Sequence, residues 1–237
     1  MTATPRTQAV AALREPLRAG AEALGWALTE AQLEALLDYL ELIAKWNRVY
    51  NLTAVREPAE MLTHHVLDSL AVVGPLRRQL QAQGLAGPRR VLDVGSGAGL
   101  PGVVLALCAP ELEVSCVDTV AKKAAFIQQA AVALRLPNLR GLHARVETLS
   151  AARGQAYDVV TSRAFASLSD FTRWSRAALA EGGFWMAMKG RVPNDEIAAL
   201  PPEVSVFHVE RLTVPGLDAE RCIVWMRPAS LHDAALT

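Results

Sequence analysis

The chain has 237 residues, half of them hydrophobic, and its 24 basic and 24 acidic side chains give a formal net charge of zero. This composition suits one large α/β domain with a helical extension and excludes a mainly disordered chain. We expect a cytoplasmic protein. No apolar run reaches the roughly 20 residues of a membrane span, the N-terminus resembles no secretory signal, and three cysteines without paired spacing fit a reducing compartment.

The N-terminal part of the chain predicts helices. Residues 6–24 are typical of a helix that Pro16 bends or breaks. Thr29 and Gln32 have the spacing of a capping box, and leucines at helical intervals follow up to Ile43. A second long helix is therefore expected to begin after Thr29.

A loop, a third helix and a linker are predicted next. Residues 47–55 are expected to form a loop, and Pro58 to open a helix near 58–73. The glycine- and proline-containing segment that follows is typical of a linker. The predicted division of the chain is a helical region at 1–80, a linker at 81–89 and a cofactor-binding domain at 90–237.

After the linker the hydrophobic period changes to that of buried strands. Seven apolar runs predict strands, at 90–94, 114–118, 139–143, 157–162, 184–189, 204–210 and 222–227. Helical patterns lie between several of them, at 102–108, 120–134 and 169–180. Strands that alternate with helices form right-handed βαβ units and a mostly parallel sheet. We therefore predict an α/β, Rossmann-like fold with a seven-stranded sheet.

The strongest local signal is the segment VLDVGSGAGLPG at residues 91–102. Gly95, Gly97 and Gly99 alternate with other residues where the first strand gives way to a helix, which permits a tight turn and close approach of a ligand to backbone amides. Asp118 ends the next strand, 23 residues after Gly95. An acid at that distance commonly binds the ribose hydroxyls of an adenosine ligand.

Two adenosine cofactors compete for this loop. Gly97, Gly99 and Gly102 satisfy the GxGxxG pattern of dinucleotide-binding proteins. Asp93 favours S-adenosylmethionine, because its carboxylate suits the ammonium group of the methionine end and would repel a pyrophosphate. We predict a class I methyltransferase that uses S-adenosylmethionine. An NAD-dependent dehydrogenase, a purely structural glycine turn and a non-catalytic RNA-binding protein remain the alternatives.

The segment after the fourth strand bears on the acceptor atom. Amino-group methyltransferases of nucleic acids place Asn or Asp followed by Pro-Pro and an aromatic residue there, whereas this chain has TSRAF at 161–165. Cytosine-C5 methyltransferases need a nucleophilic cysteine in this region, and none is nearby. A site without either element suits an acceptor atom with a free lone pair, such as guanine N7.

Several longer segments carry a resemblance to one family. They are NLTAVREPAEMLTHHVLDSL at 51–70, VLDVGSGAGLPG at 91–102, RVETL at 145–149, VVTSRAFASLSDF at 159–171, AMKG at 187–190 and PGLDAERCIVWM at 215–226. Together they resemble the bacterial 16S ribosomal RNA guanine-N7 methyltransferases of the RsmG family, also called glucose-inhibited division protein B. Residues 1–28 match this family poorly.

The resemblance implies S-adenosylmethionine as methyl donor and N7 of one guanine in the decoding-centre region of 16S rRNA as acceptor. We expect the RNA to be methylated within the small subunit or an assembly intermediate, with protein-free rRNA as the alternative. The resemblance also implies cofactor contacts at Gly95, Leu100, Asp118, Thr119, Val120, Val146, Glu147 and Arg163. The loop pattern itself adds Asp93, Gly97 and Gly99. Because N7 carries no proton, we expect no general base, and Arg163 is expected to position the reactants.

The charge distribution adds an expectation about RNA. Residues 119–191 contain 11 Lys and Arg but only 4 Asp and Glu, whereas the flanking segments are acidic. This pattern predicts a basic face for a polyanion, with a solvated surface as the alternative. The predicted RNA-binding residues are Arg56, Lys122, Lys123, Arg145, Lys189 and Arg191.

Two further features have simpler interpretations. His64 and His65 are adjacent and therefore diverge on a helix, so we predict no metal site. A hydrogen bond from His65 to Asp68 is expected to brace their helix. Phe165 is expected either to stack on a base or to pack in the core.

Overall fold

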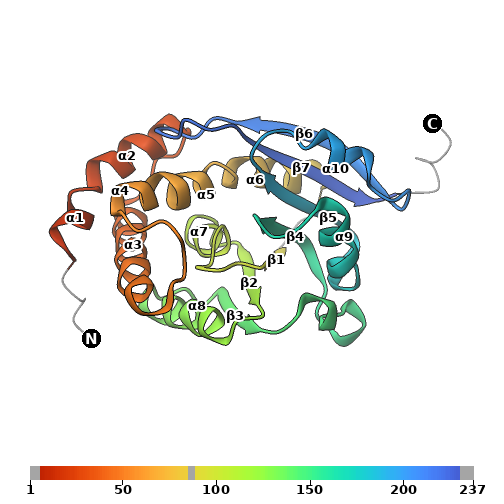
Figure 1. Ribbon diagram of the computed structural model, residues 1–237, viewed down its shortest axis with the longest axis horizontal. Coiled ribbons are helices and arrows are strands. Elements are labelled where there is room, and N and C mark those ends of the chain that lie inside the picture. The colour runs from red at the N-terminus through yellow and green to blue at the C-terminus, as the bar shows by residue number, and fades with distance from the viewer. Residues whose placement is uncertain (1–5, 85–88, 230–237) are drawn as a thin grey trace.

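A computed structural model describes residues 6–84 and 89–229 (Figure 1). In this part of the chain, seven strands form one sheet in the order β3-β2-β1-β4-β5-β7-β6. The strands are β1 Arg89–Val94, β2 Leu112–Asp118, β3 Leu139–His143, β4 Tyr157–Arg163, β5 Leu179–Lys189, β6 Val204–Leu212 and β7 Arg221–Pro228. Strands β1 to β5 pair in parallel, and β7 lies antiparallel between β5 and β6. The predicted α/β fold and its strands are confirmed.

Helices precede the sheet and connect its strands. The first group comprises α1 Gln8–Ala11, α2 Arg14–Ala23, α3 Glu30–Tyr50, α4 Pro58–Met61, a π-helix Leu62–Leu67, α5 Asp68–Leu70 and α6 Val73–Ala82. The second comprises α7 Gly102–Cys108, α8 Ala121–Ala133, α9 Leu168–Ser175 and α10 Asn194–Ala198. Short 3-10 turns lie at Val146–Thr148, Ala151–Arg153 and Arg176–Ala178. The predicted capping box of Thr29 and Gln32 is present at the start of α3.

Two of the early boundaries differ from the prediction. The first helix breaks at residues 12–13, before Pro16, which instead occupies the first turn of α2, where a backbone N–H has no intrahelical partner to lose. Helix α3 continues through residues 47–50, which were predicted as loop, and ends at Asn51 in the left-handed conformation with φ of 48°. In this last turn only Asn47 is buried, and its side chain joins the helix to the following loop through Val55 O and Thr53 N.

The predicted linker is shorter than expected at both ends. The helical segment that opens at Pro58 runs on, through the π-helix and a break at 71–72, to Ala82. Strand β1 already begins at Arg89, and residues 85–88 lie outside the described part of the chain. A π-helix within an α-helix is frequent at functional sites. Here the backbone carbonyl of His64 within it and the carboxylate of Asp68 directly after it both accept from Arg163 at the end of β4.

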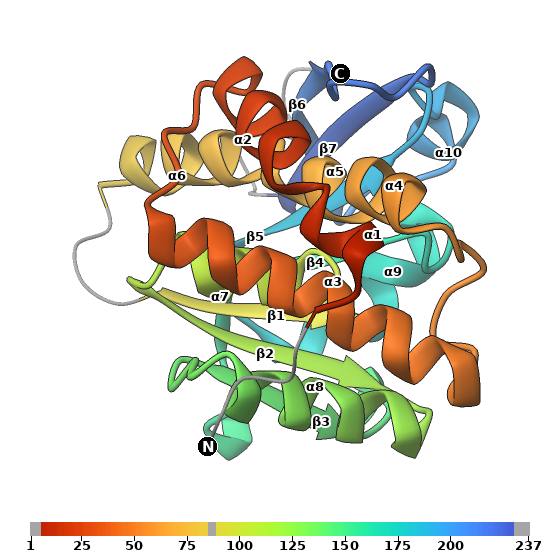
Figure 2. The ribbon, with the colours of Figure 1, turned by 90° about the vertical axis from the view of Figure 1, so that its left-hand side faces the viewer.

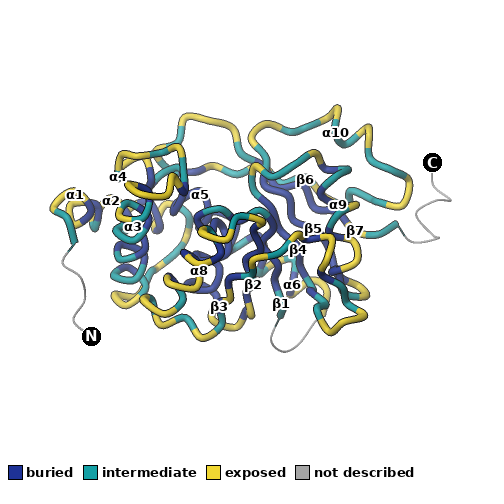
Figure 3. The backbone as a smooth tube through the Cα atoms, turned by 60° about the horizontal axis from the view of Figure 1, so that its bottom comes forward, coloured by how far each residue is buried: buried dark blue, intermediate teal, exposed yellow. Residues whose placement is uncertain are grey.

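The N-terminal helices and the sheet share one hydrophobic core. A single buried cluster contains Leu33 and Leu40 of α3, Val66, Val91 of β1 and Val103 of α7. Helices α3 and α5 pack on α7, so the helical region forms an outer layer over one face of the sheet (Figure 2). Buried residues fill most of the central strands and the inner sides of these helices, whereas β6 at one edge has none (Figure 3). No helix in the described residues is long and apolar enough to cross a membrane.

Candidate active site

Two cavities flank the glycine loop that joins β1 to α7. The larger has a volume of about 400 Å³ and the smaller about 180 Å³. Gly95 lines both, so the loop lies between them. Both lie at the carboxyl ends of the parallel strands, the edge at which open α/β sheets bind ligands.

The glycine loop leaves room for a ligand. Gly97 has φ of 58°, and no atom lies within 4 Å of the position that a Cβ would occupy. At Gly95 a Cβ would lie 2.3 Å from Cδ2 of Phe165, whose ring covers that glycine and lines the smaller cavity. Phe165 also contacts Phe171 and Trp174 edge-on, which matches the core-packing interpretation of this residue.

Contacts from two distant elements hold this loop in place. The hydroxyl of Tyr39, fully buried on α3, donates to the carbonyl of Ala98 at 2.6 Å. From the other side, Gly97 N donates to Asp118 Oδ2 at 3.1 Å. The helical region therefore supports the loop directly, a role that no local pattern around Tyr39 indicates.

Asp118 lies at the end of β2, and its carboxylate lines the smaller cavity. Besides the contact to Gly97, its Oδ1 accepts from Val120 N at 2.9 Å. Each oxygen keeps a second lone pair, so the carboxylate can still accept a ribose hydroxyl. Thr119, Val146 and Glu147 line the same cavity. The structure thus brings together most residues predicted for the adenosine end, although Val120 does not line this cavity.

Asp93 is placed differently from the other predicted cofactor residues. Its side chain is fully buried, lines neither cavity, and accepts from Gly102 N at 2.9 Å at the start of α7. Its Oδ1 has no hydrogen-bond partner. Burial raises the pKa of Asp93 to about 7, with the Gly102 amide and Arg163 acting in the opposite direction. Gly99 lines neither cavity, because its Cβ position faces Val103 and Ile127, whereas Leu100 lines the larger cavity.

The raised pKa makes stability depend on pH. The folded state binds the proton of Asp93 more tightly than the unfolded chain does. The stability that comes from this proton is therefore complete below about pH 4, and it is lost as pH rises through about 7. Asp93→Asn should remove this loss, on the order of 2–4 kcal/mol. Denaturant titrations at several pH values should show the variant more stable than wild type above about pH 7. Parallel pH profiles for both proteins would contradict this expectation.

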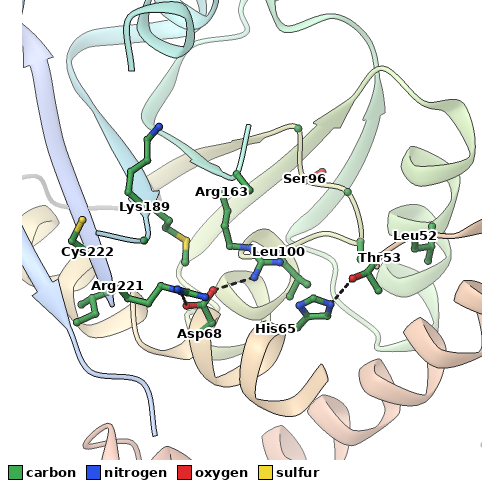
Figure 4. Close-up of a pocket in the computed structure, with 17 residues that line it drawn as sticks. Leu52, Thr53, His65, Asp68, Ser96, Leu100, Arg163, Lys189, Arg221 and Cys222 are labelled. Atoms are coloured by element: carbon green, nitrogen blue, oxygen red, sulfur yellow. Dashed lines mark hydrogen bonds and ion pairs between the residues drawn. The ribbon is translucent and has the colours of Figure 1, made fainter. Parts of the chain in front are cut away.

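A buried ion cluster forms the floor of the larger cavity (Figure 4). The carboxylate of Asp68, which is 2% exposed, forms two ion pairs. It accepts from Arg163 Nη1 at the end of β4 at 3.1 Å and from Arg221 Nε at the start of β7 at 2.9 Å. Arg163 Nη1 also donates to the carbonyl of His64 at 2.7 Å. Asp68 therefore ties the helical region to two strands and fixes the guanidinium of Arg163 against the cavity.

The predicted hydrogen bond between His65 and Asp68 is wrong. Asp68 is occupied by the two arginines, and His65 Nε2 instead shares a hydrogen bond of 2.8 Å with Thr53 Oγ1. Burial, with the nearby Arg163, lowers the pKa of His65 to about 4. Within residues 6–84 and 89–229, no group of three potential ligands is arranged to hold a metal ion.

The predicted RNA-binding residues have diverse surroundings. Lys189 lines the larger cavity and pairs with Glu196 at 2.8 Å. Arg145, which is exposed, pairs with Glu147 at 2.9 Å. The remaining contacts are Lys123 to Asp118 at 3.8 Å, Lys122 over the ring of Tyr50, and Arg56 to Asn51 at 3.4 Å. Arg191 is exposed.

Sequence reasoning missed Asp68 as a partner of Arg163, and missed Arg221, Tyr39 and Thr53. A signal existed for Asp68, because an acid in the apolar segment VLDSL would be buried and therefore needs a cation. The identity of that cation could not be inferred, because Arg221 is 153 residues away in the chain.

The parallel sheet with a reversed last strand, the glycine loop after β1 and the acid after β2 define a class I S-adenosylmethionine-dependent methyltransferase. The cofactor fits this chain, since the open space at Gly97 and the buried, unpartnered Ser96 Oγ both lie in the loop that would hold it. Residues 32–224 match the model of the GidB family, rRNA small subunit methyltransferase G. The chain belongs to this family.

Curated relatives are similar in sequence to almost the whole chain. Ribosomal RNA small subunit methyltransferase G of Paracidovorax citrulli is 67% identical, with 94% of this chain and 93% of the relative covered. The protein of the same name from Acidovorax ebreus is 66% identical, with 92% and 96% covered. A crystal structure of a MtNAS variant, 12% identical with a TM-score of 0.51, covers 95% of this chain and 91% of that one, and shows the fold alone.

Proposed function

We propose that this protein methylates N7 of one guanine in the decoding-centre region of 16S rRNA, in the cytoplasm, on the small subunit or an assembly intermediate. The observation that carries the proposal is the pair of cavities on either side of the glycine loop, together with membership in a family of small-subunit rRNA methyltransferases. The smaller cavity suits the adenosine end of the donor, and the larger is open to the acceptor.

Each residue has a defined task in this proposal. S-adenosylmethionine, when bound, supplies an electrophilic methyl group on its sulfur. Gly97 leaves open space beside the loop and Gly95 borders both cavities. Asp118 receives ribose hydroxyls, with Val146 and Glu147 beside the adenine. Leu100 borders the larger cavity and helps to exclude water. Arg163 positions the donor or the guanine with its guanidinium, which Asp68 holds in place.

The reaction needs no general base in this chain. Guanine N7 has an in-plane lone pair and no proton at neutral pH, so alignment and exclusion of water are the main contributions of the protein. An arginine that reads guanine usually grips O6 and N7 together, which would block the nucleophile. We therefore propose that Arg163 contacts O6 alone, a phosphate or the cofactor carboxylate. His65, with its pKa of about 4, is too weak a base near neutral pH.

Mapping N7-methylguanine in 16S rRNA tests the proposed function. Cells that lack this gene should lose one modified guanine, and the wild-type gene should restore it. An Asp118→Ala gene serves as a control for the methyl-donor site, since it should restore the mark poorly. Unchanged methylation in the deletion strain would disprove the proposed function.

The absence of a base predicts a flat pH profile. Single-turnover rates with saturating RNA and cofactor should vary little from about pH 6.5 to 8.5. The Asp93→Asn variant is the necessary control, because the pKa of Asp93 is about 7 although its side chain lines neither cavity. A rise with pH that disappears on replacement of His64, His65 or Glu147 would contradict the mechanism.

A further inference from the structure

The C-terminal end of α3 exposes apolar side chains beside the candidate active site. Among the described residues, Val49, Tyr50 and Val132 are the large hydrophobic side chains that remain exposed, at 71%, 39% and 70%. Two of the three are neighbours at this helix end. An exposed aromatic residue there is notable because the inner side of α3 packs in the core.

Tyr50 lies close to residues that line both cavities. Asn51 turns the chain out of the helix, and Leu52 and Thr53 then line the larger cavity. On the other side, Lys122 Nζ lies 6.0 Å from the centre of the Tyr50 ring. Lys122 belongs to the first turn of α8, three residues after Thr119, which lines the smaller cavity. Figure 2 shows this end of α3 beside the start of α8, at the edge where β2 ends.

The surroundings of Tyr50 are positively charged. Residues 45–56 contain Lys45, Arg48 and Arg56 and no Asp or Glu. These three side chains and Lys122 are exposed, and no ion pair joins them to a carboxylate within residues 6–84 and 89–229. Such cations attract phosphate groups, and their attraction depends strongly on salt.

The ring of Tyr50 is supported from below. It packs on Trp46 with ring centres 5.1 Å apart, and Trp46 packs edge-on against Phe126, which is fully buried. Lys122 lies near the distance limit of a cation–π contact, so a base can displace its ammonium group at little cost. The helix end thus presents a fixed aromatic platform surrounded by cations.

We propose that the surface formed by Arg48, Tyr50, Arg56 and Lys122, the α3-end surface, binds a single-stranded segment of rRNA near the target guanine. Tyr50 stacks on an unpaired base, and the three cations contact phosphates. Single-stranded RNA is commonly bound by aromatic stacking and basic grooves in this way. This inference rests on the proposed function, because it takes rRNA as the substrate.

The stacking role is tested with Tyr50→Ala, Tyr50→Phe and the control Val132→Ala, which removes an even more exposed apolar side chain near the far end of α8. The probe is a protein-free 16S rRNA transcript, with affinity measured by filter binding. Tyr50→Ala should weaken binding about 5- to 150-fold, as ~1–3 kcal/mol per stacked base implies. Tyr50→Phe and Val132→Ala should bind as wild type does. Affinity for S-adenosylmethionine and thermal stability should not change.

The contribution of the cations is read from salt dependence. Replacing Arg48, Arg56 or Lys122 with glutamine should reduce the slope of log Kd against log salt by about one for each phosphate that the variant no longer neutralises. In methylation assays, Tyr50→Ala should raise KM for RNA more than it lowers kcat.

Three results would overturn the α3-end surface. They are unchanged RNA affinity in Tyr50→Ala, equal losses in Tyr50→Phe and Tyr50→Ala, or a wild-type dimer in sedimentation that Tyr50→Ala dissociates. The last would identify the surface as an interface between copies of this chain. Failure of the proposed function is distinguishable, because it would appear as absence of the methylated guanine with the wild-type protein.

Discussion

Asp68→Asn is expected to lower the single-turnover methylation rate about 100-fold, because a displacement of catalytic groups by about 1 Å has an effect of this size. The substitution keeps the shape of the side chain but removes the charge that two guanidinium groups share. Arg163 and Arg221 would then repel each other, and Arg163 would leave its position against the larger cavity. Stability should also fall, because breaking a buried ion pair commonly costs about 3–5 kcal/mol. Both arginines keep 22% exposure, which should place the cost near the lower end.

A double-mutant cycle separates positioning from folding. If Asp68 acts through Arg163, Asp68→Asn should reduce the rate little further in an Arg163→Gln background. Rates are measured on folded protein, with stability followed by denaturant titration. Glu111→Gln is the matched control, since it breaks the pair of Arg77 and Glu111 that also joins the helical region to the catalytic part. That exposed pair should contribute at most about 1 kcal/mol and nothing to the rate. Additive effects of Asp68→Asn and Arg163→Gln would exclude a positioning role.

Gly97→Val is expected to abolish measurable binding of S-adenosylmethionine. Gly97 has φ of 58°, a conformation that β-branched residues rarely adopt, and its open side is the space proposed for the cofactor. Both backbone strain and the added side chain would therefore oppose binding. Asp118→Ala should be milder, about 1.5–3 kcal/mol weaker, since it removes hydrogen bonds to a charged group. Isothermal titration calorimetry measures both affinities.

Gly154→Val controls for the backbone strain. Gly154 has φ of 77°, and no atom lies within 4 Å of its would-be Cβ, but it lines neither cavity. This substitution should reduce stability without changing the affinity for S-adenosylmethionine. Cofactor binding by Gly97→Val at wild-type strength would refute the proposed site, and so would equal reductions of affinity in the two valine variants.

Local patterns in the sequence determined the elements and the identity of the cofactor loop. The change of hydrophobic period after the linker predicted the seven strands, because buried strands and amphipathic helices distribute apolar residues differently. The glycines at 95, 97 and 99 and the acid at 118 indicated an adenosine cofactor, because the turn and the ribose contact require these residue types at fixed spacing. The capping box at Thr29 was equally local and equally predictable.

Only the tertiary structure decided which distant side chains share a site. Arg221 and Asp68 are brought together because β7 is inserted beside β5, and because the helical region over one face of the sheet places Asp68 where β4 ends and β7 begins. The tasks of Asp93 and Tyr39 also depend on this packing. Asp93 is predicted from sequence as a cofactor ligand, but its neighbours place it behind the loop, where it holds the start of α7. Burial and long-range pairing depend on the summed contacts of many elements, and no local spacing encodes them.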